Sequence, residues 1–158
     1  MQEELAPRVE SIIDMKLKAF LKECFNHFEH RWSHFRDSKI LSEPRHFDFL
    51  RSELPSIRHS SQVSLIYRSS RDGWRTVDFH HFCDNVGPTV LLLKTSKGKV
   101  CGGYTFVSWT SSGTFASDER AFLFSVSNEQ RYVCRDMNRA VFHSEAGPSF
   151  GGCSLDID

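Results

Sequence analysis

Apolar runs in the middle of the chain alternate with turn residues, and this pattern predicts a meander of β-strands. Residues 90–93 form a short apolar run after Gly87 and Pro88, residues 100–107 follow a polar turn, and residues 121–126 follow a loop rich in Ser and Thr. Apolar runs of this length, separated by Gly and Pro, are typical of strands. We expect three antiparallel strands, the first of them buried on both faces.

Two adjacent glycines, Gly102 and Gly103, interrupt the second of these expected strands. Glycine weakens a strand interior because it has no side chain to pack. A pair of glycines there indicates either a β-bulge or a close approach of another part of the protein. The sequence leaves both interpretations open.

Apolar residues recur at spacings of three and four through residues 8–36, which is the period of a long amphipathic helix. Such a helix could pack on its own domain or self-associate as a short coiled coil, although its aromatic residues are unusual at a coiled-coil seam. His30 and His34 would share one face, but they have no third ligand nearby, so we expect no metal site. A polar connection containing Pro44 follows. We therefore divide the chain into a helical segment, 1–39, and a domain, 40–158.

Shorter elements are expected on either side of the meander. They are a helix at 47–54, a strand at 63–67, a helix at 77–83 with Phe79 and Phe82 facing inwards, two strands within 131–142 and a loop at 147–152. The whole pattern predicts an α+β fold: a mostly antiparallel two-layer β-sandwich with short helices, preceded by the long N-terminal helix.

Six short sequence words occur in the order that one known family has. They are LIYRSSRDGW (65–74), FHHFCDNVGPT (79–89), VCGGYT (100–105), WTSSG (109–113), AFLFSV (121–126) and GPSFGG (147–152). On these words the chain resembles the TLDc domain over residues 40–155. Family domains usually continue well past the last word, whereas here its third glycine is replaced by Cys153. The resemblance thus implies a TLDc-like domain that is incomplete at its C-terminus.

The same resemblance implies a non-catalytic module that binds another protein. TLDc proteins are linked to protection against oxidative damage and to regulation of the vacuolar proton-pumping ATPase. Peripheral subunits of that pump are therefore expected partners, and the cytoplasm is the expected location. We expect no cofactor and no enzymatic activity, because the serines, His143 and Asp118 are not accompanied by a Gly-x-Ser-x-Gly elbow.

Composition narrows the classes of partner. Lys and Arg together number 20, as do Asp and Glu, so the formal net charge is zero. This balance argues against a nucleic-acid partner, and no apolar run reaches the roughly 18 residues of a membrane span. The cysteines are scattered, odd in number and without a Cys-x-x-Cys pair, which argues against a disulfide framework and for a reducing compartment.

Candidate partner-binding residues fall in two polar loops. The first holds Trp109, Ser111 and Ser112, and the second holds Arg71 and Asp72. An aromatic residue beside a polar loop is a common anchor of a protein interface. The alternative is that Trp109 packs beneath its own loop.

Cys83 is the candidate for redox chemistry, because His80 and Asp84 lie close to it in sequence. A neighbouring imidazolium can lower the pKa of a thiol and make it reactive toward oxidants. A cysteine-based redox protein or scavenger is therefore the alternative function. Flanking phenylalanines favour instead a buried structural thiol, with His80 fixing a loop by hydrogen bonding.

Overall fold

The computed structural model describes residues 16–20, 22–23, 35, 37–54 and 63–151. The chain falls into two compact units, Met1–Arg36 and Asp37–Asp158. In the first unit, residues 16–20 and 22–23 are helical, with Leu17 and Phe20 exposed. The remainder of the expected helix 8–36 lies almost wholly outside the described residues, as do His30, His34 and the self-association expected of that segment.

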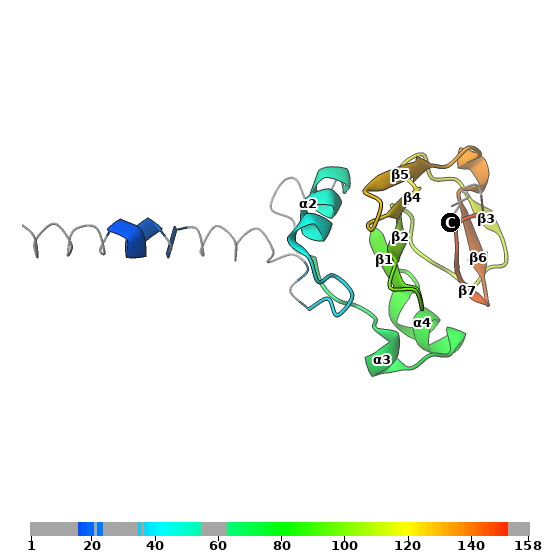
Figure 1. The fold of residues 1–158 in the computed structure, drawn as a ribbon. Coiled ribbons are helices and arrows are strands. Elements are labelled where there is room, and N and C mark those ends of the chain that lie inside the picture. Colours follow the sequence, from blue (N-terminus) through cyan, green and yellow to red (C-terminus); the bar gives the residue numbers. More distant parts are fainter. Residues whose placement is uncertain (1–15, 21, 24–34, 36, 55–62, 152–158) are drawn as a thin grey trace, which may run out of the picture. The chain divides into compact units, whose positions relative to one another are not determined.

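The second unit contains a four-stranded and a three-stranded antiparallel sheet within its described residues (Figure 1). The strands are β1 (Thr89–Lys94), β2 (Val100–Thr105), β3 (Phe115–Ala116), β4 (Phe122–Ser125), β5 (Gln130–Val133), β6 (Val141–Ser144) and β7 (Gly147–Ser149). The first sheet has the order β1-β2-β4-β5 and the second the order β3-β6-β7. Because β1, β2 and β4 are neighbours, the expected meander is confirmed.

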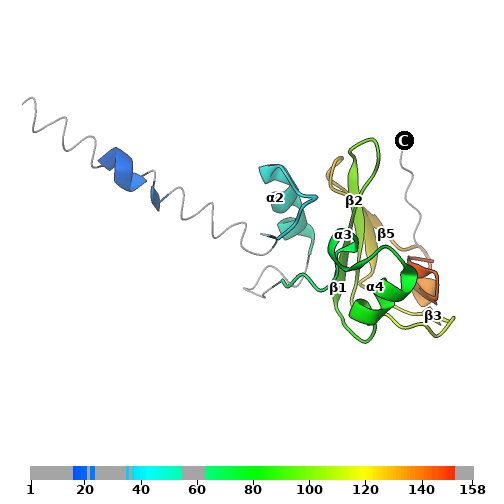
Figure 2. The same ribbon diagram turned by 90° about the horizontal axis from the view of Figure 1, so that it is seen from below.

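Short helices accompany the sheets, and together they confirm the α+β class. They are α2 (Pro44–Glu53), α3 (Ser69–Asp72), α4 (Thr76–Cys83) and the 3₁₀ helix η2 (Met137–Arg139). Figures 1 and 2 show α3 and α4 at one end of the two sheets. α4 begins with a capping box, in which Arg75 and Asp78 bond each other across its first turn, and this pairing fixes where the helix starts.

One apolar core lies between α2 and the four-stranded sheet. Phe122 and Phe124 of β4 are completely buried, and Phe49 of α2 meets the ring of Phe124 edge-on at 6.4 Å. Each fully buried side chain of this size stabilises the fold by about 1.5–3 kcal/mol. An ion pair of 3.6 Å between Arg131 and Glu53 also joins β5 to α2.

A second apolar core connects the four-stranded sheet to the rest of the domain. Its buried members are Phe79, Cys83, Trp109, Ala121, Cys134, Ala140 and Val141. Phe150, which follows β7, packs against this core and against the backbone of Gly103 in β2, where an added Cβ would lie only 2.5 Å from its ring. The three-stranded sheet is thus packed against the four-stranded one, as expected for two layers.

The glycine pair marks a close approach and not a bulge. The register between β1 and β2 runs unbroken through Leu91 opposite Gly103 and Leu92 opposite Gly102. A Cβ on Gly102 would lie 2.0 Å from the carbonyl oxygen of Leu91 and 2.7 Å from the ring of Phe124. Only glycine fits at this position without displacing its neighbours.

Several local predictions differ from the structure. β1 was expected to be buried on both faces, but it is a half-buried edge strand, and Leu93 is 52% exposed. Residues 63–67, expected to be a strand, have no regular secondary structure; Ile66 and Tyr67 pack on the second core. The segment expected to be a loop at 147–152 contains β7, an edge strand, where proline is tolerated.

The cysteines in the described part of the chain are of two kinds. Cys83 and Cys101 are buried free thiols, whereas Cys134 is disulfide-bonded. The disulfide at Cys134 differs from the expectation that the cysteines form no disulfide framework.

Candidate functional site

The C-terminal end of α4 meets the loop of residues 109–114, which we call the Trp109 loop. Asp84, the residue after α4, forms an isolated parallel bridge with Trp109. The backbone N–H of Asn85 donates to the carbonyl of Trp109 at 2.9 Å. Two segments that are distant in sequence are thereby fixed side by side.

Trp109 lies beneath this loop and is only 3% exposed. Its indole N–H donates to the hydroxyl of Thr89 at 2.9 Å, and its ring meets those of Phe79 and Phe150 edge-on at 5.9 and 5.6 Å. In this conformation Trp109 has no face open to a partner. Its burial favours the second interpretation of the sequence, in which the tryptophan supports its own loop.

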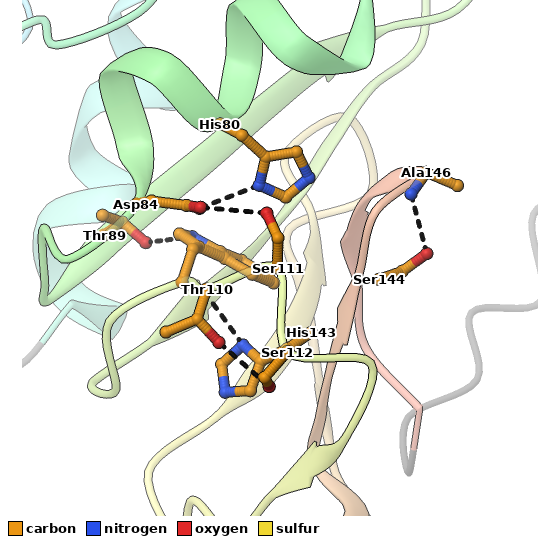
Figure 3. Close-up of polar contacts among 10 residues, drawn as sticks. His80, Asp84, Thr89, Thr110, Ser111, Ser112, His143, Ser144 and Ala146 are labelled. Carbon is orange, nitrogen blue, oxygen red and sulfur yellow. Dashed lines mark hydrogen bonds and ion pairs between the residues drawn. The ribbon is translucent and has the colours of Figure 1, made fainter.

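The carboxylate of Asp84 joins α4 to the loop through two side chains (Figure 3). The Nδ1 atom of His80 lies 2.8 Å from one carboxylate oxygen, and the Ser111 hydroxyl donates to the other at 3.0 Å. In a serine hydrolase the hydroxyl bonds to the histidine and the histidine to the acid. Here the serine bonds to the acid itself, and Nε2 of His80 is buried without a hydrogen-bond partner among the described residues. The geometry fixes the loop against α4.

His143 of β6 holds the other side of the loop. Its Nδ1 accepts the N–H of Thr110 at 3.2 Å, its carbonyl accepts the N–H of Gly113 at 2.8 Å, and its own N–H donates to the carbonyl of Thr114 at 2.9 Å. Burial lowers the pKa of His143, and the negative charge of Asp84 opposes that shift. The ring is therefore neutral at pH 7, which suits an Nδ1 that accepts a hydrogen bond.

The top of the loop presents hydroxyl groups to water. Ser111, Ser112 and Thr114 are exposed, and the Ser112 hydroxyl bonds those of Thr110 and Thr114 at 3.1 and 2.8 Å. A loop pinned from beneath and polar on top offers a defined set of hydrogen-bonding groups. Such preorganisation lowers the entropic cost of binding a partner.

The second candidate pair, Arg71 and Asp72, forms a two-pronged ion pair at α3. The guanidinium Nε and Nη2 donate to the two carboxylate oxygens at 2.6 and 2.8 Å, and Asp72 also accepts the N–H of Arg68 at 2.7 Å. Arg71 holds the pKa of the Asp72 carboxyl below its usual range. Asp72 thus stabilises the turn of α3, and the half-exposed Arg71 is the member of the pair that a partner can reach. No hydrogen bond among the described residues joins this pair to the Trp109 loop.

Two further residues stand out that sequence reasoning missed. Trp74 is 81% exposed and Val77 is 60% exposed. Trp74 precedes the helix cap at the position from which an apolar side chain often packs back on the helix, here toward Phe79. It points into water instead, because Tyr67 and Trp109 already cover the Phe79 ring. A tryptophan is usually well buried, so its place in the LIYRSSRDGW word gave no sign of this exposure.

Asp118, named in the sequence as a possible triad acid, has a structural role. It is 5% exposed, and one of its oxygens accepts the Thr105 hydroxyl and the N–H of Phe106, both at 2.7 Å. Its other oxygen accepts the N–H of Arg120 at 2.9 Å. A buried carboxylate with this many donors is bound in place and not available as a catalytic acid.

Cys83 is 4% exposed, and burial, assisted by the charges of Asp84 and Asp72, raises the pKa of its thiol to about 11. At pH 7 the thiolate fraction is then on the order of one in ten thousand. We expect iodoacetamide at neutral pH to leave Cys83 unlabelled in the native chain and to label it in urea, as read by peptide mass spectrometry. Ser96→Cys, on an exposed turn, is the reactive control. Native labelling of Cys83 as fast as that control would contradict this burial.

Among the described residues, no group of three or more His, Cys, Asp or Glu side chains is arranged to hold a metal ion. Nor does any helix in that part of the chain have the length and apolar character needed to cross a bilayer.

The fold and loop define an α+β domain in which a polar surface loop rests on a buried tryptophan. A family model described as the TLDc domain matches residues 35–158, and the chain belongs to this family. The resemblance seen in the sequence words is thereby confirmed.

Curated relatives of this chain include proteins named MTOR-associated protein MEAK7. The one from Danio rerio is 35% identical over 100 residues, which is 63% of this chain and 22% of the relative. The one from Xenopus laevis is 27% identical over 132 residues (73% and 28%), and the one from Mus musculus is 33% identical over 82 residues (41% and 18%). The chain spans less than a third of the length of each of these relatives.

Proposed function

We propose that this TLDc domain is a non-catalytic protein-interaction module. The observation that carries the proposal is the geometry at Asp84, where His80 and Ser111 both bond to one carboxylate at 2.8 and 3.0 Å. The side chains that could have served as base and nucleophile instead hold an exposed loop in one shape. Rigid surface loops of this kind suit recognition, because little order has to be imposed on binding.

The contact surface that we propose has two parts: the hydroxyls of Ser111 and Ser112, and the exposed pair Arg71 and Trp74. Tryptophan and arginine are enriched among the residues that contribute most to protein interfaces. Trp74, with 81% of its surface open to water, has the most apolar area to bury against a partner.

We further propose the class of partner. The names of the relatives contain an association with mTOR, and the family resemblance implies the peripheral subunits of the vacuolar proton-pumping ATPase. The experiment below therefore measures binding of both candidate partners, mTOR and the pump subunits. We also propose that the protein is cytoplasmic and that it takes part in protecting the cell against oxidative damage.

A pull-down experiment tests this proposal. The full chain is immobilised and incubated with a eukaryotic cell extract, and the bound pump subunits and mTOR are measured by immunoblot. We expect retention by the wild-type chain and a loss of at least about ten-fold with Trp74→Ala, since truncating an interface anchor costs 2 kcal/mol or more. Leu93→Ala is the matched control, because Leu93 is another exposed apolar residue, on the edge strand β1. Failure to retain either partner, or equal retention by Trp74→Ala, would count against the proposal.

The alternative of a Cys83-based redox protein makes a different prediction. The burial of the thiol and its raised pKa weigh against it. A peroxide-consumption assay separates the two functions: we expect no consumption by the wild-type chain. Consumption that disappears in Cys83→Ser would establish the redox function instead.

A further inference from the structure

We infer that a second surface, made by Phe106, Phe115, Arg120, Met137 and Arg139, binds an acidic peptide segment that carries an apolar side chain between its carboxylates. The inference rests on the proposed function, because it adds a second contact surface and the chemistry of the partner that would occupy it.

Asp118 brings the segments of this surface together. Its buried carboxylate accepts the N–H groups of Phe106 and Arg120 at 2.7 and 2.9 Å, and its own N–H donates to the carbonyl of Met137 at 3.0 Å. β3, which begins at Phe115, lies against η2. Segments that are separate in sequence are therefore held around one carboxylate.

The apolar members are unusually open to water. Phe106 is 45% exposed, Phe115 is 42% exposed and Met137 is 46% exposed. Phenylalanine, methionine and arginine are three of the residue types enriched in protein interfaces. The composition of this surface is thus that of a contact region and not of an ordinary solvated face.

The guanidinium groups of two arginines lie over phenylalanine rings. The guanidinium carbon of Arg120 is 4.0 Å from the centre of the Phe106 ring, and that of Arg139 is 4.1 Å from the centre of the Phe115 ring. Stacking restricts the guanidinium while its N–H groups remain at the edge, free to donate. Neither arginine forms an ion pair with a described residue. Each restrained guanidinium can donate two parallel hydrogen bonds to the two oxygens of a carboxylate.

Charged residues of both signs neighbour the two arginines in sequence. The Asp118 carboxylate is occupied by the donors of its loops, and the Asp136 carboxylate accepts the N–H of Asn138 at 3.1 Å. Glu119 is exposed, as is Arg135. The donors that this surface offers a partner are those of the stacked guanidinium groups of Arg120 and Arg139, which calls for a partner that supplies acceptors.

The inference can be tested by NMR. The backbone amide chemical shifts of the isotope-labelled full chain are measured during titration with a short peptide in which glutamates flank a phenylalanine. We expect the shifts to concentrate at residues 105–107, 115–120 and 136–139. The double change Arg120→Glu and Arg139→Glu should weaken binding at least about ten-fold. The matched control reverses two charges elsewhere, Lys97→Glu with Lys99→Glu in the β1–β2 turn, and should bind as the wild type does.

A second variant keeps the test independent of folding. If the double arginine variant loses its circular dichroism spectrum, Met137→Gln removes apolar surface at an exposed position and should still weaken the peptide about three-fold or more. The inference is overturned if the shifts map to Lys94–Lys99, or if a peptide with lysines in place of the glutamates binds equally well. Binding of phosphatidylserine vesicles or oligothymidine at these residues, without the peptide, also overturns it. If the peptide fails while the full chain still retains its partner from extract, only this surface assignment is lost.

Discussion

Gly102→Ala is expected to destabilise the domain by about 3 kcal/mol or more, which is the upper range for overpacking a core. The new methyl group would lie 2.0 Å from the backbone oxygen of Leu91 and 2.7 Å from the buried ring of Phe124. Neither neighbour can give way cheaply, because the first belongs to the β1–β2 ladder and the second is completely buried. Urea denaturation followed by circular dichroism measures the loss.

Gly98→Ala is the matched control for this substitution. Gly98 lies in the turn between β1 and β2 with a φ of +79° and has no atom near its missing Cβ. Alanine there meets only backbone strain, which costs about 1–2 kcal/mol. Equal losses for the two variants would mean that glycine's conformational freedom, and not the contact between strands, is what Gly102 provides.

Asp118→Ala is expected to cost about 3 kcal/mol, because it leaves several donors without their acceptor. The donors are the Thr105 hydroxyl and the N–H groups of Phe106 and Arg120, at 2.7, 2.7 and 2.9 Å. The same denaturation experiment measures the effect.

The neighbouring carboxylate provides the comparison. Glu119 is exposed, so Glu119→Ala should change the free energy of unfolding by less than about 0.5 kcal/mol. If Asp118→Ala unfolds at the same urea concentration as Glu119→Ala, Asp118 does not hold these loops together.

Local pattern was enough to predict much of the fold. The apolar runs at 90–93, 100–107 and 121–126 became β1, β2 and β4, and the stretch 77–83 became α4, because each element's own residues favour it. Position within the sheet could not be predicted in the same way. Whether a strand lies in the middle or at the edge depends on pairing with distant residues, and β1 was therefore expected to be more buried than it is.

The candidate site shows the same division. The sequence singled out Ser111, His80 and Trp109, but the bond between Ser111 and Asp84 spans 27 residues of chain and no spacing rule predicts it. The exposure of Trp74 was equally hidden, since it depends on other rings having already covered Phe79. Short sequence motifs identify which residues are important. Tertiary contacts determine which of those residues are buried beneath a surface and which are exposed on it.

The packing of α2 has a practical consequence for anyone who trims this chain for expression. Phe49 packs on the buried ring of Phe124 in β4, and Glu53 is ion-paired to Arg131. A fragment that starts after α2 would expose the apolar face of the four-stranded sheet to solvent. Large exposed apolar surfaces promote aggregation of recombinant proteins. A fragment expressed as the isolated domain should therefore begin before Pro44.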